Sequence, residues 1–305
     1  MSYPGFPYLT LHQYLSRLHL ADCATGTLWL DEQGRARGRY VNATLTSVFQ
    51  AIRAGDGGRV SGYDAYARSY AGNEDSDQGL TIWRLLDLAA SDDESVSLDR
   101  LCRLLHTINF FRQGATAGSD LYLNVHSRLL TAVAGDHGRA FRRILDALEL
   151  PAQPIVLQLP LINASQRWVL AHVAENYRRN GFRIALLARH LAEAGDLLER
   201  VRPDAIKLDV RLANDAPAQI RLLEQAYRQH CKIIFTRLED EQQLQALQTG
   251  LDTSRSYFVQ GFLFDQPKAG LASNQDDASN ESKNVAPRQT AISNWEQRRS
   301  NNFSA

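Results

Sequence analysis

Short apolar runs rich in β-branched residues recur along the chain from about residue 120 onward. Each run is followed by a stretch in which apolar residues return with the period of an α-helix, and then by another run. Continuous apolar runs are typical of strands that are covered on both faces, as the strands of parallel sheets are. We therefore expect strands at LYLNV (121–125), PIVLQLP (154–160), RIALLA (183–188), AIKLDV (205–210), KIIFTR (232–237) and YFVQGFLF (257–264).

Two of the intervening stretches carry clear helix signals. SQRWVLAHVAENYRRNG begins with Ser165, which is suited to cap a helix N-terminus, and ends with the helix breaker Gly181. APAQIRLLEQAYRQH has the same period. Strands that alternate with helices indicate βαβ units with right-handed crossovers. The residues expected on the apolar faces of these two helices are Trp168, Val169, His172, Val173, Tyr177, Ile220, Leu223 and Tyr227.

Two further strands, VFQAI (48–52) and GYDAYAR (62–68), precede this series. The glycine-rich segment between them is too short for a parallel crossover, which needs about a dozen residues, so they form a hairpin. Eight strands, the first of them antiparallel to its neighbour, favour a closed barrel over an open Rossmann-type sheet. The expected fold class is α/β, a TIM-like (β/α)8 barrel.

The flanks of the barrel follow other patterns. A short amphipathic helix and a hairpin that turns at Gln33 and Gly34 form an N-terminal extension, which we expect to pack on the barrel or to meet a partner. The C-terminal end has almost no periodic apolar residues and is expected to be a disordered tail. The helix is marked by Leu11, Leu15 and Leu18, and the expected boundaries are 1–45 for the extension, 46–270 for the barrel and 271–305 for the tail.

Composition narrows the classes of function. Lys plus Arg and Asp plus Glu are equal at 34 each, so no net field draws the chain to nucleic acid or to an anionic membrane. The cysteines Cys23, Cys102 and Cys231 are too far apart in sequence to indicate a zinc site or a disulfide framework. The chain shows neither a secretory signal nor a membrane-spanning apolar run. We expect a cytoplasmic protein that does not bind nucleic acid directly.

The strand motifs, taken in series, resemble the EAL family of bacterial cyclic di-GMP phosphodiesterases. FQAI resembles that family's YQPI, GYDAYAR its GxEALLR, LYLNV its LxxN, AIKLDV its IKID, and YFVQGFLFDQP its QGYLFGKP. The match runs in order from about residue 46 to 268. The resemblance implies a barrel with an antiparallel first strand, in agreement with the hairpin.

Active members of that family hydrolyse a phosphodiester with two divalent cations, which carboxylates at the strand ends hold. The resemblance implies that this chain has lost most of them. The family's acidic positions fall on Asp64, Gln158, Leu161, Leu187, Ala188 and Thr236, with Arg237 in place of a glycine and RHLAEAGD as a shortened loop. One short acid and an amide do not hold two dications, so we expect no bound metal, no cofactor and no catalytic residues.

Several polar residues of the family pattern are nevertheless retained, and two interpretations of them stay open. They bind a nucleotide, with Arg68 near a phosphate, or Arg68, Asp64 and Lys207 form a buried salt-bridge cluster that closes the barrel mouth. The vestigial ligand-binding candidates are Gln50, Asp64, Arg68, Asn124, Lys207, Glu239 and Gln260.

The function predicted from this pattern is that of a catalytically inactive, EAL-like regulatory protein in bacterial cyclic di-GMP-related signalling. Family members without the metal site act by binding, so the expected partner is a protein that the sequence does not identify. The alternatives, in order, are a receptor that binds cyclic di-GMP without hydrolysis and an active phosphodiesterase. The resemblance also implies a homodimer as a candidate state.

Overall fold

A computed structural model describes residues 27–70, 91–114, 118–127, 137–161, 167–251 and 256–272. The predicted N-terminal helix, the expected cap Ser165 and most of the predicted tail lie outside these ranges. The elements are β1 Thr27–Leu30, β2 Ala36–Tyr40, β3 Ala43–Ala54, β4 Val60–Tyr70, α3 Asp92–Phe111, β5 Asp120–Asn124, α5 His137–Ala147, β6 Ile155–Leu159, α6 Arg167–Arg179, β7 Arg183–Ala188, α7 Leu191–Arg200, β8 Ala205–Asp209, η2 Val210–Leu212, α8 Ala216–Arg228, β9 Lys232–Thr236, α9 Glu241–Gly250 and β10 Phe258–Gln260.

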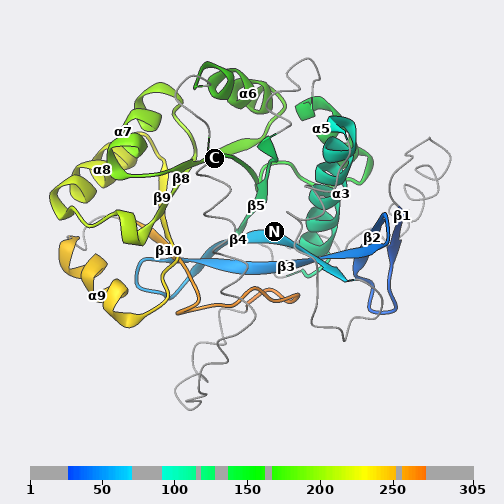
Figure 1. Cartoon of the computed structure of the whole chain (residues 1–305), viewed down its shortest axis with the longest axis horizontal. Coiled ribbons are helices and arrows are strands. Elements are labelled where there is room, and N and C mark those ends of the chain that lie inside the picture. The colour runs from blue at the N-terminus through cyan, green and yellow to red at the C-terminus, as the bar shows by residue number, and fades with distance from the viewer. Residues whose placement is uncertain are drawn as a thin grey trace, which may run out of the picture. The chain divides into compact units, whose positions relative to one another are not determined.

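Strands β3 to β10 close into a barrel, with helices on its outside (Figure 1). Around the barrel the order is β3, β10, β9, β8, β7, β6, β5 and β4, and pairing of β4 with β3 completes the circle. Strands β4 to β10 are parallel to their neighbours in this order, whereas β3 is antiparallel to both β4 and β10. The predicted TIM-like barrel with an antiparallel first strand is confirmed.

The turn between β3 and β4 is tied to the far end of the chain. Arg53 donates hydrogen bonds to the carbonyl oxygens of Gly57 and Gly58, which lie in this turn. The same guanidinium forms a buried ion pair with Asp265, with Nε 2.6 Å from Oδ2. Gly57 has a φ of +80°, a conformation that glycine adopts without steric cost. These contacts hold the hairpin against the segment that follows β10.

The hairpin of β1 and β2 extends the sheet beyond the barrel (Figure 1). Its turn contains Gly34 at a φ of +69°, which confirms the predicted turn. Strand β2 pairs with the first residues of β3, with Gly38 opposite Leu45. Helix α3 covers this junction, where the Asn109 side chain donates to and accepts from the backbone of Ala36.

The barrel interior contains an apolar layer to which most strands contribute one residue. Because successive side chains of a strand point to opposite faces, these inward positions fix which residues further along each strand also point inward. The layer is fully buried, and its members are Ile52, Tyr122, Val156, Ala185, Ala205 and Ile234, with Phe258 packed against them.

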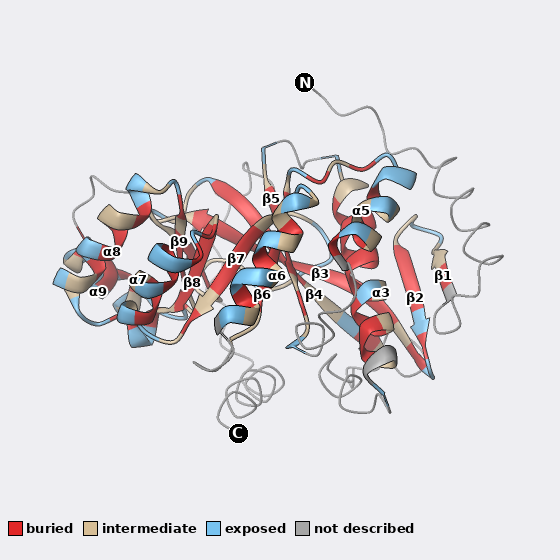
Figure 2. Ribbon diagram, turned by 90° about the horizontal axis from the view of Figure 1, so that it is seen from above, coloured by how far each residue is buried: buried red, intermediate tan, exposed pale blue. Residues whose placement is uncertain are grey.

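Two helix faces differ from the prediction. Trp168 and His172 of α6, and Ile220 and Tyr227 of α8, are exposed, although the sequence pattern placed them on apolar inner faces. Tyr177 of α6 and Leu223 of α8 are buried, as predicted, and the other buried side chains belong to a neighbouring stripe. Figure 2 shows exposed stretches of α6 in pale blue. The reason is that each helix of a barrel buries only the narrow stripe that meets the sheet, so small residues such as alanine sit there. This stripe comprises Leu170, Ala174 and Tyr177 on α6, and Leu222, Leu223 and Ala226 on α8.

Within the described part of the chain, no helix combines the length and the apolar character that crossing a bilayer requires.

Candidate functional site

A polar layer lies next to the apolar layer inside the barrel, two residues further toward the carboxyl ends of the parallel strands. The period of two along a strand places these side chains on the same inner face as the apolar layer. Carboxyl ends of barrel strands are where α/β barrels place their functional groups. The layer consists of Gln50, Asp64, Asn124, Gln158, Leu187, Lys207, Thr236 and Gln260.

The centre of this layer is a buried ion pair between Asp64 and Lys207. Lys207 Nζ lies 2.7 Å from Asp64 Oδ2, and the two side chains are 2% and 3% exposed. The Tyr66 hydroxyl donates to the same carboxylate oxygen at 2.8 Å. Lys207 Nζ also lies 4.8 Å from the centroid of the Tyr122 ring, where the ring face attracts a cation. Burial raises the pKa of Tyr122 well above its usual range, so the phenol stays neutral beside the pair.

Gln260 links the ion pair to the closing strand β3. Its Nε2 donates to Gln50 Oε1 at 3.0 Å and lies 3.3 Å from Asp64 Oδ2. Gln50 Nε2 in turn donates to the carbonyl oxygen of Asp265 at 2.9 Å. The predicted strand 257–264 is therefore too long, because the chain leaves the sheet after Gln260 and turns.

Gly261 makes this turn possible. A Cβ at Gly261 would overlap the backbone nitrogen and carbonyl oxygen of Leu238. Leu238 itself is held on both sides, since its N–H donates to Gln260 O at 3.2 Å and its carbonyl accepts from Leu263 N at 3.0 Å. The QGFLF motif thus requires its glycine for close backbone approach.

Replacing Gly261 by alanine is expected to destabilise the protein by about 2–3 kcal/mol, because backbone must move to relieve the overlap. For a chain of this size, that corresponds to a fall in Tm of about 5 °C or more in a thermal unfolding experiment. Gly270→Ala is the control, since a Cβ there meets nothing within 4 Å. Equal Tm values for the two variants would contradict the expectation.

Asn124 and Gln158 form a neutral amide pair on the neighbouring strands. Gln158 Nε2 donates to Asn124 Oδ1 at 2.7 Å, and the Gln158 side chain is fully buried. In the EAL pattern the position of Gln158 carries an acid. Here the uncharged amide of Gln158 occupies Asn124 Oδ1 with a hydrogen bond, and this oxygen is one of the ligands that a hard cation would need.

Asp209, at the end of β8, is held between two arginines. Arg211 donates to both carboxylate oxygens, at 3.0 Å from Nε and 2.7 Å from Nη2. Arg237 Nη1 lies 3.5 Å from Asp209 Oδ2. Sequence reasoning did not select Asp209, although it stands within the AIKLDV segment two residues after Lys207.

Two of the predicted ligand-binding residues are exposed and not buried within the polar layer. Arg68 is exposed near the end of β4, with its guanidinium 5.7 Å from the centroid of the Tyr70 ring. Glu239 is exposed after β9. The buried cluster of Arg68, Asp64 and Lys207 was one of the two interpretations left open. The structure shows Asp64 and Lys207 as a buried pair and Arg68 as exposed. The structure brings together Gln50, Asp64, Lys207 and Gln260, and it places Asn124 on the same inner face.

The segment RHLAEAGD is helical rather than a loop. Helix α7 begins at Leu191, three residues after β7 ends at Ala188, and His190 Nδ1 caps it by accepting from Glu193 N at 3.1 Å. The Glu193 carboxylate accepts from the Arg189 backbone and side chain. This acid is thus engaged at the helix start, and the positions at the end of β7 are Leu187 and Ala188.

The donor set does not fit two divalent cations. Each of the carboxylates Asp64 and Asp209 is already compensated by a fixed side-chain cation, and the other inward positions offer amides, a hydroxyl or an alkyl group. A dication needs several oxygen ligands, chiefly carboxylates. Among the residues that the structure describes, no three His, Cys, Asp or Glu side chains gather as a metal-binding group.

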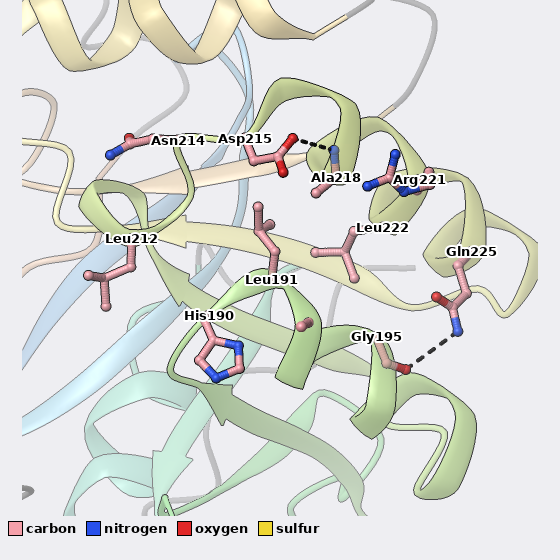
Figure 3. A pocket seen from close by; sticks show the side chains of 11 residues that line it. His190, Leu191, Gly195, Leu212, Asn214, Asp215, Ala218, Arg221, Leu222 and Gln225 are labelled. Carbon is pink, nitrogen blue, oxygen red and sulfur yellow. Dashed lines mark hydrogen bonds between the residues drawn. The ribbon is translucent and has the colours of Figure 1, made fainter.

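A groove with a cavity volume of about 830 Å³ lies on the outer surface, between α7 and α8 (Figure 3). Leu191, Leu212 and Leu222 line its floor and sides, and Arg221 and His190 lie at its edge. It is separate from the polar layer of the barrel interior, and Leu212 is 55% exposed within it.

Comparison with known proteins agrees with this architecture. The sequence model of the EAL domain matches residues 35–267. No curated protein matches the sequence significantly. Among solved structures, the fold is similar to the Bacillus subtilis YkuI protein, which has an EAL domain and is in complex with c-di-GMP and calcium (TM-score 0.60, 18% identity, 85% of this chain and 61% of that chain).

Two other solved structures are similar to the same degree. One is Klebsiella pneumoniae BlrP1 with FMN and cyclic diGMP and no metal ions (TM-score 0.56, 19% identity, 82% of this chain and 58% of that chain). The other is the EAL domain of Xanthomonas citri FimX in complex with c-diGMP (TM-score 0.58, 15% identity, 75% of this chain and 90% of that chain). The chain thus spans about six tenths of the length of YkuI and of BlrP1. With most of its length matched by the domain and its barrel built in the same way, the chain belongs to the EAL domain family.

Proposed function

We propose that this protein is a catalytically inactive EAL-domain regulator, which acts by binding in bacterial cyclic di-GMP-related signalling. The observation that carries the proposal is the state of the two carboxylates left at the strand ends. Asp64 is neutralised by Lys207, and Asp209 by Arg211 and Arg237. A site whose acids are already paired with fixed cations repels a pair of dications, and without them no activated water is supplied.

The turnover assay is direct. Incubation of the protein with cyclic di-GMP and Mn²⁺ or Mg²⁺ is expected to release no linear dinucleotide above the protein-free rate. That means turnover at least about 10⁴-fold below the ~10 s⁻¹ typical of enzymes. The measurement is separation of the cyclic and linear dinucleotides over time. Hydrolysis that is present in the wild type and absent in Asp64→Ala would overturn the proposal.

We propose that the protein exerts its regulatory effect through contact with a protein partner. Support comes from large apolar side chains on the outer surface: Trp168 is 70%, Tyr227 66% and Leu212 55% exposed. Exposed aromatic residues are enriched at protein interfaces. A cytoplasmic location and a homodimeric state belong to the same proposal.

A second candidate function is reception of cyclic di-GMP without hydrolysis. Two observations favour it: the YkuI, BlrP1 and FimX structures contain this dinucleotide, and the BlrP1 complex has no metal ions. In this chain Arg68 is an exposed guanidinium near the end of β4, and a guanidinium suits a phosphate. Calorimetric titration of cyclic di-GMP into the protein tests this candidate, and Arg68→Ala is expected to weaken the binding. No heat of binding in the wild type would contradict it.

A further inference from the structure

We propose that the groove between α7 and α8 is the docking site for one amphipathic α-helix of a partner protein, a helix with an apolar stripe and an acidic side chain beside it. The inference rests on the proposed function of a binding regulator and names the surface through which that regulator acts. The groove has a volume of about 830 Å³ and lies outside the barrel (Figure 3). Leu191, Leu212 and Leu222 give it an apolar lining, and Leu212 is 55% exposed.

The groove exists because small residues of two neighbouring helices face each other across it. Ala192 and Gly195 line it from α7, and Ala218 lines it from α8. Residues three or four positions apart lie on the same face of a helix, so Ala192 and Gly195 leave one face of α7 without long side chains. Hollows of this kind accept the apolar side chains that an amphipathic helix presents at every third or fourth position.

Gly195 shows that the hollow does not serve packing within the chain. It lies inside α7, where glycine is less favourable than alanine because it loses more backbone entropy on folding. A Cβ at Gly195 would meet only Gln225 Oε1, at an ordinary contact distance of 3.7 Å. At the helical Gly138, in contrast, a Cβ would lie 2.8 Å from Asn180 Nδ2, so that glycine is needed by the fold itself. The unfavourable residue at position 195 keeps the groove open for a helix from outside the chain.

Arg221, at the edge of the groove, supplies a positive charge for the occupant. It lies on α8 and is exposed (Figure 3). In the part of the chain that the structure describes, no hydrogen bond or ion pair joins its guanidinium to another residue. A guanidinium with no acid of its own chain matches a carboxylate, which it binds through two parallel N–H donors.

The other titratable groups of the lining are already engaged. The Asp215 carboxylate caps α8 by accepting from Ala218 N at 3.0 Å. It stands where backbone N–H groups of the helix N-terminus offset a negative charge, about 9 Å along the axis from Arg221. His190 Nδ1 accepts from Glu193 N at 3.1 Å, which leaves the hydrogen of the neutral ring on Nε2 as a donor. The groove therefore combines an apolar lining with donors for an acid, and this combination fits an acidic amphipathic helix.

The probe for this site is a phage-displayed library of helical peptides about 15 residues long. Each peptide has one apolar stripe, varied among Leu, Ile, Met and Phe, with either glutamate or lysine beside it. Selection on the full-length protein is expected to enrich the glutamate peptides. The best of these, titrated by fluorescence anisotropy, is expected to bind with a Kd of about 10 µM or lower, and its lysine counterpart at least about tenfold more weakly.

Variants of the protein connect this binding to the groove. Arg221→Glu is expected to reverse the preference, so that the lysine counterpart binds more tightly than the glutamate peptide. Leu212→Asp is expected to weaken the glutamate peptide by about tenfold or more, because it places a charge in the apolar lining. Arg143→Glu is the matched control: Arg143 is exposed on α5, and its change alters the net charge by the same amount. It is expected to leave the Kd within about twofold.

Two changes at Gly195 separate the groove from the stability of the fold. Gly195→Ala is expected to raise the Tm by about 1–3 °C, because alanine favours the helix and its Cβ meets no close neighbour. Gly195→Leu fills the groove and is expected to weaken the selected peptide by about tenfold or more. Ala171→Leu, at an exposed position of α6, is its control and is expected to leave the Kd unchanged within about twofold.

Four results would overturn the inference. They are a library without binders, selected peptides that do not respond to Arg221→Glu, a lower Tm in Gly195→Ala, and a wild-type dimer that Leu212→Asp dissociates. The last, measured by sedimentation velocity, assigns the groove to a second copy of this chain. The turnover assay measures hydrolysis without any peptide, so a failure of the docking site and a failure of the non-catalytic proposal are distinguishable.

Discussion

Replacing Lys207 by alanine is expected to lower the free energy of unfolding by about 3–5 kcal/mol, because the change leaves the Asp64 carboxylate buried without its cation. The two side chains are almost completely buried and 2.7 Å apart. Hydrogen bonds from Tyr66 and Gln260 to Asp64 remain in the variant and place the loss toward the lower end of that range. Urea unfolding of wild type and variant at neutral pH measures the difference.

The control for this prediction removes both charges together. In the double variant Asp64→Leu and Lys207→Met, side chains of similar volume replace the pair, and such replacements are often neutral or stabilising. We therefore expect the double variant to be at least about 1 kcal/mol more stable than Lys207→Ala. A loss below about 1 kcal/mol in Lys207→Ala would show that the pair does not confer the stability that its burial implies.

Acidification is expected to destabilise the protein through His106, a buried residue of α3 whose side chain contacts β3. Its Nδ1 lies 2.8 Å from Ser47 Oγ. Burial lowers the pKa of His106 from 6.5 to about 3, and the more distant Asp64 opposes this only in part. The unfolded chain therefore binds a proton below about pH 6.5 that the folded protein does not bind until about pH 3.

The sign and size of the effect follow from this difference. Since the unfolded state holds the extra proton, this contribution to stability is fully present above about pH 6.5. As the pH is lowered from there, the free energy of unfolding falls by about 1.4 kcal/mol per pH unit, and the total loss at pH 3 is about 5 kcal/mol. Chemical unfolding at a series of pH values measures the slope. His106→Gln places an amide, which does not titrate, beside Ser47, so the slope of its stability between about pH 6 and pH 4 is expected to be shallower by about 1.4 kcal/mol per pH unit.

His172→Gln is the matched control, since His172 is exposed on α6. Carboxylates that titrate in the same range contribute to the slope of every variant and cancel in the comparison. If His106→Gln and wild type share one slope, His106 is not the group that links stability to pH.

The positions of the barrel strands were predictable, because parallel strands buried on both faces require uninterrupted apolar runs. The buried faces of α6 and α8 were predictable only in part, since Tyr177 and Leu223 are buried as predicted whereas Trp168 and Tyr227 are exposed. Apolar periodicity indicates a helix, but two neighbouring stripes of one helix often satisfy the same period. The choice between them depends on which side chains fit against the sheet.

Helix α3 shows a different limit of the sequence pattern. It is 20 residues long, yet six of its buried side chains are polar: Ser95, Asp99, Arg103, His106, Thr107 and Asn109. Polar residues are buried when they find partners, as Arg103 does in Asp99 and Asn109 does in the backbone of Ala36. An apolar count does not detect such a face, because its partners come from distant parts of the chain.

The positions of the candidate site residues were likewise predictable only in part. Asn124, Lys207 and Gln260 lie on the inner face, as expected from their place at strand ends, since strand alternation alone sets that direction. Arg68 and Glu239 are exposed, and Asp209 acquires its two arginines from η2 and from the loop after β9. Loop geometry beyond a strand end has no comparable periodic signal.

By itself, the sequence determined that apolar strands and helices alternate into a barrel, and that the residues at the strand ends are poor in acids, because both are properties of residue type and local spacing. Only the tertiary structure decided which charges meet. Asp64 and Lys207 are 143 positions apart and become neighbours because the barrel closes, and Asp209 meets Arg237 because β8 pairs with β9. Contacts across a closed sheet depend on register and loop conformation, which no local pattern encodes.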